Sequence, residues 1–159
     1  MGAPWNNINR KTEDAFKAVI QAQFAQHLSG LQVVTGHEFA ELESERIEIR
    51  CPTAEPETYA DRFTGNWRVT VAIALVTNME DKTRTNRKDM TGELFDAILD
   101  DELISWLNNQ SGVPDFHAFG GNEGQGEGFE LQSVSSDALD HSFIEVLTGT
   151  LYCKPSTGE

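Results

Sequence analysis

The sequence lacks the local motifs of the common catalytic sites. It contains no GxSxG nucleophile elbow, no HExxH zinc motif, no Walker phosphate loop and no dinucleotide-binding fingerprint. The four histidines are scattered, at spacings that would not gather a metal site locally: His27, His37, His117 and His141. We therefore expect a protein without catalytic residues, bound metal or cofactor.

Cysteine is scarce as well. Cys51 and Cys153 are the only two, and each lies near the end of a predicted strand. Two isolated thiols make neither a zinc site nor a disulfide framework, so we expect small buried apolar residues. The two thiols could approach each other if their strands were neighbours.

Long apolar runs are also absent, and basic residues are few. No run approaches the roughly 18 apolar residues of a membrane span, and the N-terminus MGAPWNNINRK has no apolar signal segment. We therefore expect a cytosolic protein. With 12 basic and 26 acidic residues, the net charge is −14, which repels phosphate backbones. The charge suits either solubility alone or a surface past which DNA slides, and composition does not separate the two.

At 159 residues the chain fits one domain. We expect an N-terminal arm over residues 1–11, a single α+β domain over 12–153 and a flexible tail over 154–159. The arm carries Trp5, which either packs back on its own domain or anchors on a neighbouring subunit.

The first half of the domain begins with a helical pattern. Apolar residues at spacings of three and four predict a helix over 12–29, with Thr12 as its N-cap. Alternation predicts strands over 31–39 and 46–51. Residues 52–65 contain two prolines and several acids, which indicates a long connection of the kind that serves an interface or a site.

The second half is built around two long strands. Both faces of the last strand, 143–153, carry apolar residues. The strand over 67–76 turns apolar on its second face, so we expect both strands to be central and covered on two sides. The helical pattern over 90–109 is interrupted at 100–102, which predicts a kink or two short helices. The three carboxylates there are typical of a helix start rather than of a cation site.

Two loops have unusual composition. The first holds a third of all Lys and Arg, namely Lys82, Arg84, Arg87 and Lys88. It is either a solvated turn or a contact loop that orients an encounter with an acidic surface or with phosphates. The second loop, GGNEGQGEG at 120–128, is too rich in glycine for anything but a mobile loop or a hairpin tip.

These elements predict an α+β fold: a mixed, largely antiparallel sheet with two main helices packed on it, in a single domain with long loops. Their order, the acidity and the small size resemble those of the tail-terminator and neck (head–tail joining) proteins of long-tailed bacteriophages. The resemblance is carried by the helix over 12–29, by RVTVAIAL followed by MTGELFDAIL, and by the closing SFIEVLTGTLYC.

The resemblance implies a non-enzymatic virion subunit. Such proteins form a ring, commonly six-fold, that caps the tail tube, joins it to the head connector and lets DNA pass. The implied partners are further copies of the chain, the tail-tube protein and head-connector proteins, with DNA only as passing cargo and no membrane. Trp5 and the four cations of the loop are the expected contacts. The alternatives are a small acidic monomeric or dimeric adaptor that imitates nucleic acid or inhibits a partner, and an enzyme with a dispersed site.

Overall fold

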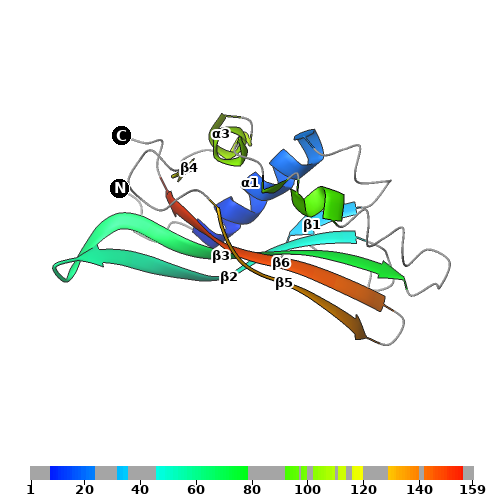
Figure 1. Cartoon of the computed structure of the whole chain (residues 1–159). Coiled ribbons are helices and arrows are strands. Elements are labelled where there is room, and N and C mark those ends of the chain that lie inside the picture. Colours follow the sequence, from blue (N-terminus) through cyan, green and yellow to red (C-terminus); the bar gives the residue numbers. More distant parts are fainter. Residues whose placement is uncertain are drawn as a thin grey trace.

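The computed structural model shows a curled, mostly antiparallel sheet with helices on one side, in a single small domain (Figure 1). This confirms the predicted fold class. The structure describes residues 8–23, 32–35, 46–78, 92–96, 98–99, 102–109, 111–113, 116–119, 129–139 and 142–155. The elements are α1 (Ile8–Gln23), β1 (Gln32–Thr35), β2 (Arg46–Tyr59), β3 (Arg62–Asn78), α3 (Leu103–Asn109), β4 (His117–Ala118), β5 (Glu130–Leu139) and β6 (Ser142–Lys154).

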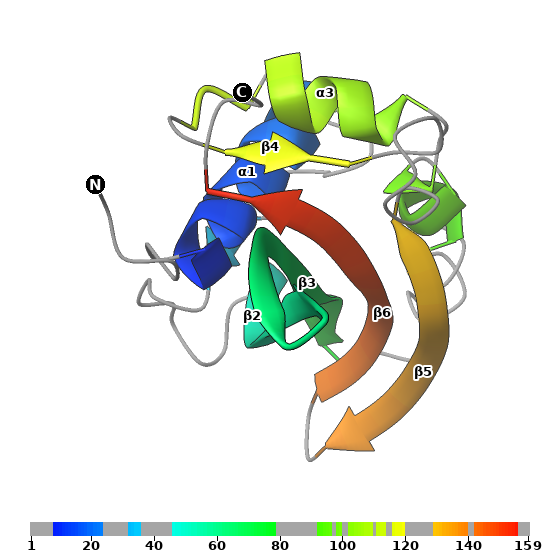
Figure 2. The same cartoon turned by 90° about the vertical axis from the view of Figure 1, so that its left-hand side faces the viewer.

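The two long strands lie in the middle of the sheet. The strand order is β1-β2-β3-β6-β4, and β5 also pairs with β6. All of these pairs are antiparallel except β1 with β2, which is parallel. The central positions predicted for β3 and β6 are therefore confirmed. Figure 2 shows how β5 and β6 curve around the end of the sheet.

The core lies between the sheet and the helices. Phe16, Val19 and Ile20 of α1 are buried against the inward side chains of β2 and β3. Those side chains alternate along each strand as predicted: Ile47, Ile49 and Cys51 on β2, and Trp67, Val69, Val71, Ile73 and Leu75 on β3. None of the described helices has the length and apolarity that a membrane span needs.

The first helix begins earlier than predicted. It starts at Ile8, so the expected N-cap at Thr12 is wrong. Thr12 is buried inside the helix, and its hydroxyl donates to the Ile8 carbonyl oxygen at 2.7 Å. Such a bond lets a hydroxyl residue sit within a helix without an unpaired polar group. Residues 24–29 of the predicted helix lie outside the described residues.

The interruption at 100–102 divides the second helical region as predicted. Residues 92–96 are helical, the bond from Leu99 N to Phe95 O closes that segment, and α3 follows from Leu103. Asn108 of α3 then holds β4 in place: its side chain accepts a bond from Ala118 N at 2.7 Å and donates to Ala118 O at 2.9 Å.

The predicted cover on the second face of the central strands is not supplied by the described helices, which lie on one side of the sheet (Figure 1). On the opposite side Ala72 and Ala74 of β3 and Ile144 and Val146 of β6 are only partly buried, whereas Val76 is 6% exposed. This outer face is apolar at its centre.

Candidate interaction surface

The segment predicted as a long connection, residues 52–65, is a β-hairpin. β2 continues through it to Tyr59, and β3 starts at Arg62. Pro52 and Pro56 are compatible with this strand because β1 pairs with β2 only over residues 46–49. Beyond that point β2 has only β3 as a partner among the described strands, and an edge position tolerates the missing N–H of a proline. The prediction of a long connection here is therefore wrong. The two prolines indicated a loop, but a strand can contain them when it lies at an edge.

The far part of this hairpin leaves the body of the protein. Trp67 is the first residue of β3 that pairs with β6. Residues 62–66 and the part of β2 opposite them therefore have no third strand, and we call residues 56–66 the projecting ribbon. At the usual rise per residue, 62–66 extend roughly 16 Å. Figure 1 shows the ribbon reaching beyond the helices.

Local chemistry shapes the ribbon. Ala60 and Asp61 have φ of 52° and 64°, the left-handed pair that two-residue hairpins with matching twist require. A register shift near Pro56 is accommodated at Gly65, whose φ is 92°. Thr64 stabilises this irregular part of the ribbon: its hydroxyl donates to the Glu57 carbonyl oxygen at 3.0 Å and accepts from the Asn66 backbone N–H at 3.3 Å.

The base of the ribbon carries a cross-strand ion pair. Arg68 Nη2 lies 3.2 Å from Glu55 Oε2, and both side chains are about half exposed, so solvent screens the pair. Beside Arg68, on β6, burial raises the pKa of Tyr152, and the nearby Glu130 carboxylate raises it further.

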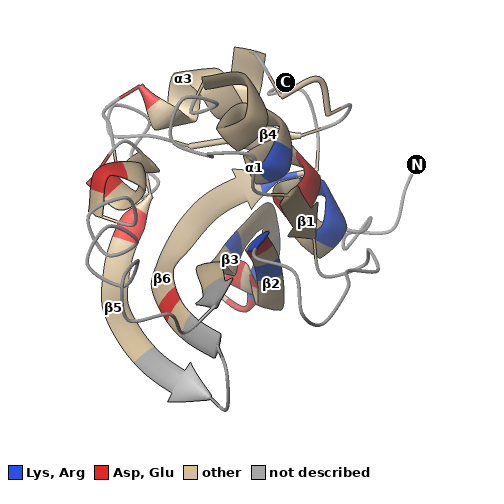
Figure 3. Ribbon diagram, turned by 90° about the vertical axis from the view of Figure 1, so that its right-hand side faces the viewer, with Lys and Arg blue, Asp and Glu red and all other residues tan. Residues whose placement is uncertain are grey.

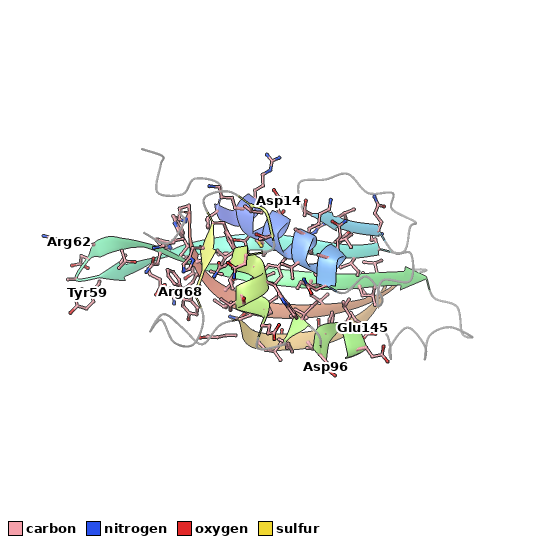
Figure 4. All side chains as sticks on the ribbon, turned by 90° about the horizontal axis from the view of Figure 1, so that it is seen from above. Asp14, Tyr59, Arg62, Arg68, Asp96 and Glu145 are labelled. Atoms are coloured by element: carbon pink, nitrogen blue, oxygen red, sulfur yellow. The ribbon has the colours of Figure 1, made fainter. Side chains whose placement is uncertain are left out.

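The tip of the ribbon combines an aromatic ring with a free cation. Tyr59 is 81% exposed and pairs across the strands with Arg62. Among the Lys and Arg residues that the structure describes, Arg62 is the one without an ion-pair or ring partner. Figure 4 places both side chains at the far end of the molecule, away from the core.

A second exposed surface lies on β5. Leu131 and Val134 are 48% and 53% exposed. They stand opposite Gly149 and Leu147 of β6, so they lie on the face of the sheet that carries the helices. With Tyr59 they are the exposed large apolar side chains of the described chain. The helices that cover β2 and β3 do not extend over this edge strand.

Acidic groups border this surface. Glu145 stands opposite Ser136, whose hydroxyl lies 3.4 Å from Glu145 Oε2. Glu145 is 9% exposed, and its Oε1 has no hydrogen-bond partner. Asp96, on the helical segment 92–96, is exposed and has no ion-pair partner within the described residues. Figure 3 shows Asp and Glu on that segment and on β6, whereas Lys and Arg lie mainly on α1, β2 and β3.

Phe129 immediately precedes β5 and packs against the core. Its ring lies 5.4 Å from the ring of Phe16 and over Gly149. A Cβ at position 149 would meet the Phe129 ring at 2.5 Å and the Glu130 carbonyl oxygen at 2.7 Å. A glycine is therefore required at this position for β5 to approach β6, and the sequence shows no signal for it.

The two thiols are buried and inert. Both cysteines are free, and β3 separates the strands that carry them. Burial raises the pKa of Cys51, with the Glu13 and Cys153 charges adding to the rise. Burial also raises the pKa of Cys153 to about 12, against a lowering contribution from the Thr12 hydroxyl. Neither thiol is a nucleophile near neutral pH.

The contacts predicted from the sequence lie elsewhere. Trp5 and the cations Lys82, Arg84, Arg87 and Lys88 lie outside the described residues, so their roles remain predictions. The described residues contain no group of three His, Cys, Asp or Glu side chains placed to hold a metal ion. What the described chain offers is an interaction surface: the ribbon tip and the β5 patch, which sequence reasoning missed.

Comparison with known proteins identifies no relative, since neither a protein-family model nor a curated protein matches the chain.

Proposed function

We propose that the protein is a non-enzymatic structural subunit of a phage virion. It forms a ring at the head–tail junction that terminates the tail tube and lets DNA pass. The observation that supports this most directly is the projecting ribbon at one end of the domain, together with a different exposed surface on β5. A contact between two different surfaces repeats from copy to copy and closes into a ring when the rotation allows it.

The charge supports the same proposal. With a net charge of −14, a lumen lined by this protein would repel the DNA backbone and let it slide. The partly buried outer face of β3 and β6, with Ala72 and Ala74 at its centre, is a further surface for a neighbouring protein. Small side chains allow a backbone to approach closely.

The proposed partners follow from the resemblance of the sequence pattern. They are five further copies in a six-membered ring, the tail-tube protein on one side and head-connector proteins on the other. The proposed location is the tail or neck of the virion, after assembly in the host cytoplasm. No membrane, metal or cofactor takes part, and the cations of the 82–88 loop contact a neighbouring virion protein.

Light scattering over a range of concentrations, with negative-stain imaging, tests the proposal. We expect rings, alone or after addition of tail-tube protein. A strict monomer that joins neither rings nor tubes would count against the assembly role. It would favour the alternative of a small acidic adaptor or inhibitor that acts as a monomer.

A further inference from the structure

The exposed large hydrophobic side chains of the described chain occur at two places only. Tyr59 lies at the tip of the projecting ribbon, and Leu131 and Val134 lie on β5. Large apolar side chains that gather at two defined places mark interaction sites more often than singly scattered ones do. The two places belong to different parts of the sheet, and Figure 4 shows the ribbon tip at one end and Glu145 and Asp96 at the other.

Arg62 lies opposite Tyr59 at the ribbon tip, next to Asp61 of the turn, whereas the charged residues at the β5 end are the acidic Asp96 and Glu145. Arg62, beside Tyr59, has no partner within the described chain, and Asp96 has none either. Glu145, at the β5 end, keeps one buried carboxylate oxygen without a donor. The ribbon tip carries the Arg62 guanidinium, a hydrogen-bond donor, next to the Tyr59 ring.

The free edges of β2 and β5 differ in whether a further strand could pair with them. β2 runs along its free edge with Pro52 and Pro56, and proline prevents a further strand from pairing there. β5 pairs only with β6 among the described strands, and its sequence ELQSVSSDAL contains no proline, lysine or arginine. Its protective features are the bulge at Gln132 and the acidic residues Glu130 and Asp137. Among the described strands, β5 is therefore an edge without proline.

We propose that the ribbon tip of one copy docks on the β5 patch of a second copy. In this contact the Tyr59 ring covers Leu131 and Val134, and the Arg62 guanidinium pairs with the exposed Asp96 carboxylate. Tyrosine and arginine are the residue types that most often dominate such contacts. The inference rests on the proposed ring, because it names the contact that joins its subunits.

Site-directed crosslinking tests the contact directly. A Tyr59→Cys variant and a Val134→Cys variant are mixed under mild oxidation, and disulfides are mapped by mass spectrometry. The native thiols do not interfere because both are buried. We expect a disulfide between positions 59 and 134, formed faster than one between the Tyr59→Cys and Ser105→Cys variants. Ser105 is an exposed residue of α3 and serves as the matched control.

Two outcomes would overturn the inference. One is equal crosslinking to the control position, and the other is a predominance of 59–59 or 134–134 disulfides, which indicate a two-fold contact. Rings that form without the 59–134 disulfide would overturn the inference and leave the ring proposal intact. A 59–134 disulfide in open chains that never close would support the contact and count against the ring.

Substitutions at the two surfaces give a second test. Loss of a central aromatic anchor by Tyr59→Ser should weaken self-association about 30-fold, whereas Tyr59→Phe should change it little. Arg62→Asp and Asp96→Arg should each weaken it, and a mixture of the two variants should associate better than either alone. Both residues are exposed, so circular dichroism should confirm an unchanged fold. Unchanged association of all the single variants would contradict the contact.

Discussion

The carboxylate of Glu13 accepts a hydrogen bond from the backbone N–H of Cys51, with 2.9 Å between Oε2 and N. Cys51 lies where the register of β2 against β3 shifts, so the sheet leaves its backbone groups free. The Cys51 carbonyl oxygen in turn accepts a hydrogen bond from the side-chain amide of Asn9 at 2.8 Å. Helix α1 thus supports the sheet at the residue after which β2 runs out toward the projecting ribbon.

We expect Glu13→Ala to lower the free energy of unfolding by about 1–3 kcal/mol, because it leaves a buried N–H without an acceptor. Glu13→Gln keeps an acceptor oxygen and should cost less. Urea denaturation measures both changes. Asp14→Asn is the neighbouring control: the Asp14 side chain is 40% exposed and lies 4.0 Å from that of Arg10, which is 65% exposed, so the loss should be small. Equal losses at both positions would contradict the role of the Glu13 bond.

Gly149 should not tolerate alanine. The added Cβ would overlap the Phe129 ring and the backbone of Glu130, and overpacking of this kind costs about 1–3 kcal/mol. Phe129→Leu should restore only part of the loss, because the backbone oxygen stays in place. A Cβ at Gly92 meets nothing within 4 Å, so Gly92→Ala should be neutral or slightly stabilising. Thermal unfolding of the three variants checks this order.

The ribbon turn should be improved by residues that favour the left-handed region. Ala60→Asn with Asp61→Gly replaces two side chains held at positive φ by the pair that such turns prefer. Because the ribbon extends past β6, we expect slower amide exchange at the tip with little change in global unfolding. Faster exchange at residues 57–64 would show that the turn has a different geometry.

The thiols should make stability depend on alkaline pH. The folded pKa of Cys153 is about 12, above the ordinary value of 9.0, and that of Cys51 is raised as well. The unfolded thiols lose protons that the folded ones keep, so their contribution is complete below pH 9 and is lost as the pH rises toward 12. Urea denaturation of the wild type and of Cys153→Ala should therefore show a larger alkaline loss in the wild type. Parallel losses would contradict the assignment to Cys153.

The cationic loop is tested by charge reversal. We expect Arg84→Glu with Arg87→Glu to leave folding intact and to impair assembly, because the loop is predicted to contact a partner. Arg10→Glu with Lys17→Glu changes the net charge equally on α1 and serves as the control. Assembly that is normal in the loop variant, or impaired equally in the control, would reduce the loop to a solvated turn.

Local patterns were sufficient for much of the fold. The alternation in Ile47, Ile49 and the inward residues of β3 identified the buried faces, because side-chain direction in a strand depends only on position. The run of acids at 100–102 likewise marked the break between two helical segments. The N-cap was misplaced because Thr12 satisfies its hydroxyl within the helix, which sequence does not distinguish from a cap.

The interaction surfaces could not be predicted in this way. Pro52 and Pro56 indicate a loop unless their strand is known to be an edge, and that depends on how far β1 extends. The exposure of Leu131 and Val134 depends on which strands the helices cover, and the need for Gly149 depends on the ring of Phe129. These are relationships between segments far apart in the chain.

The sequence by itself therefore determined the element types outside residues 52–65, the inward faces of β2 and β3, the acidity and the lack of local catalytic motifs. Each of these depends on composition or on neighbours a few residues away. Only the tertiary structure decided that residues 52–65 form a hairpin whose end projects as the ribbon, that the described helices cover one face of the sheet, and that Arg62 and Asp96 have no ion-pair partner within the described residues. The physical reason is that the burial and the ion pairing of a side chain depend on which strands and helices pack beside it. Those neighbours come from distant parts of the chain.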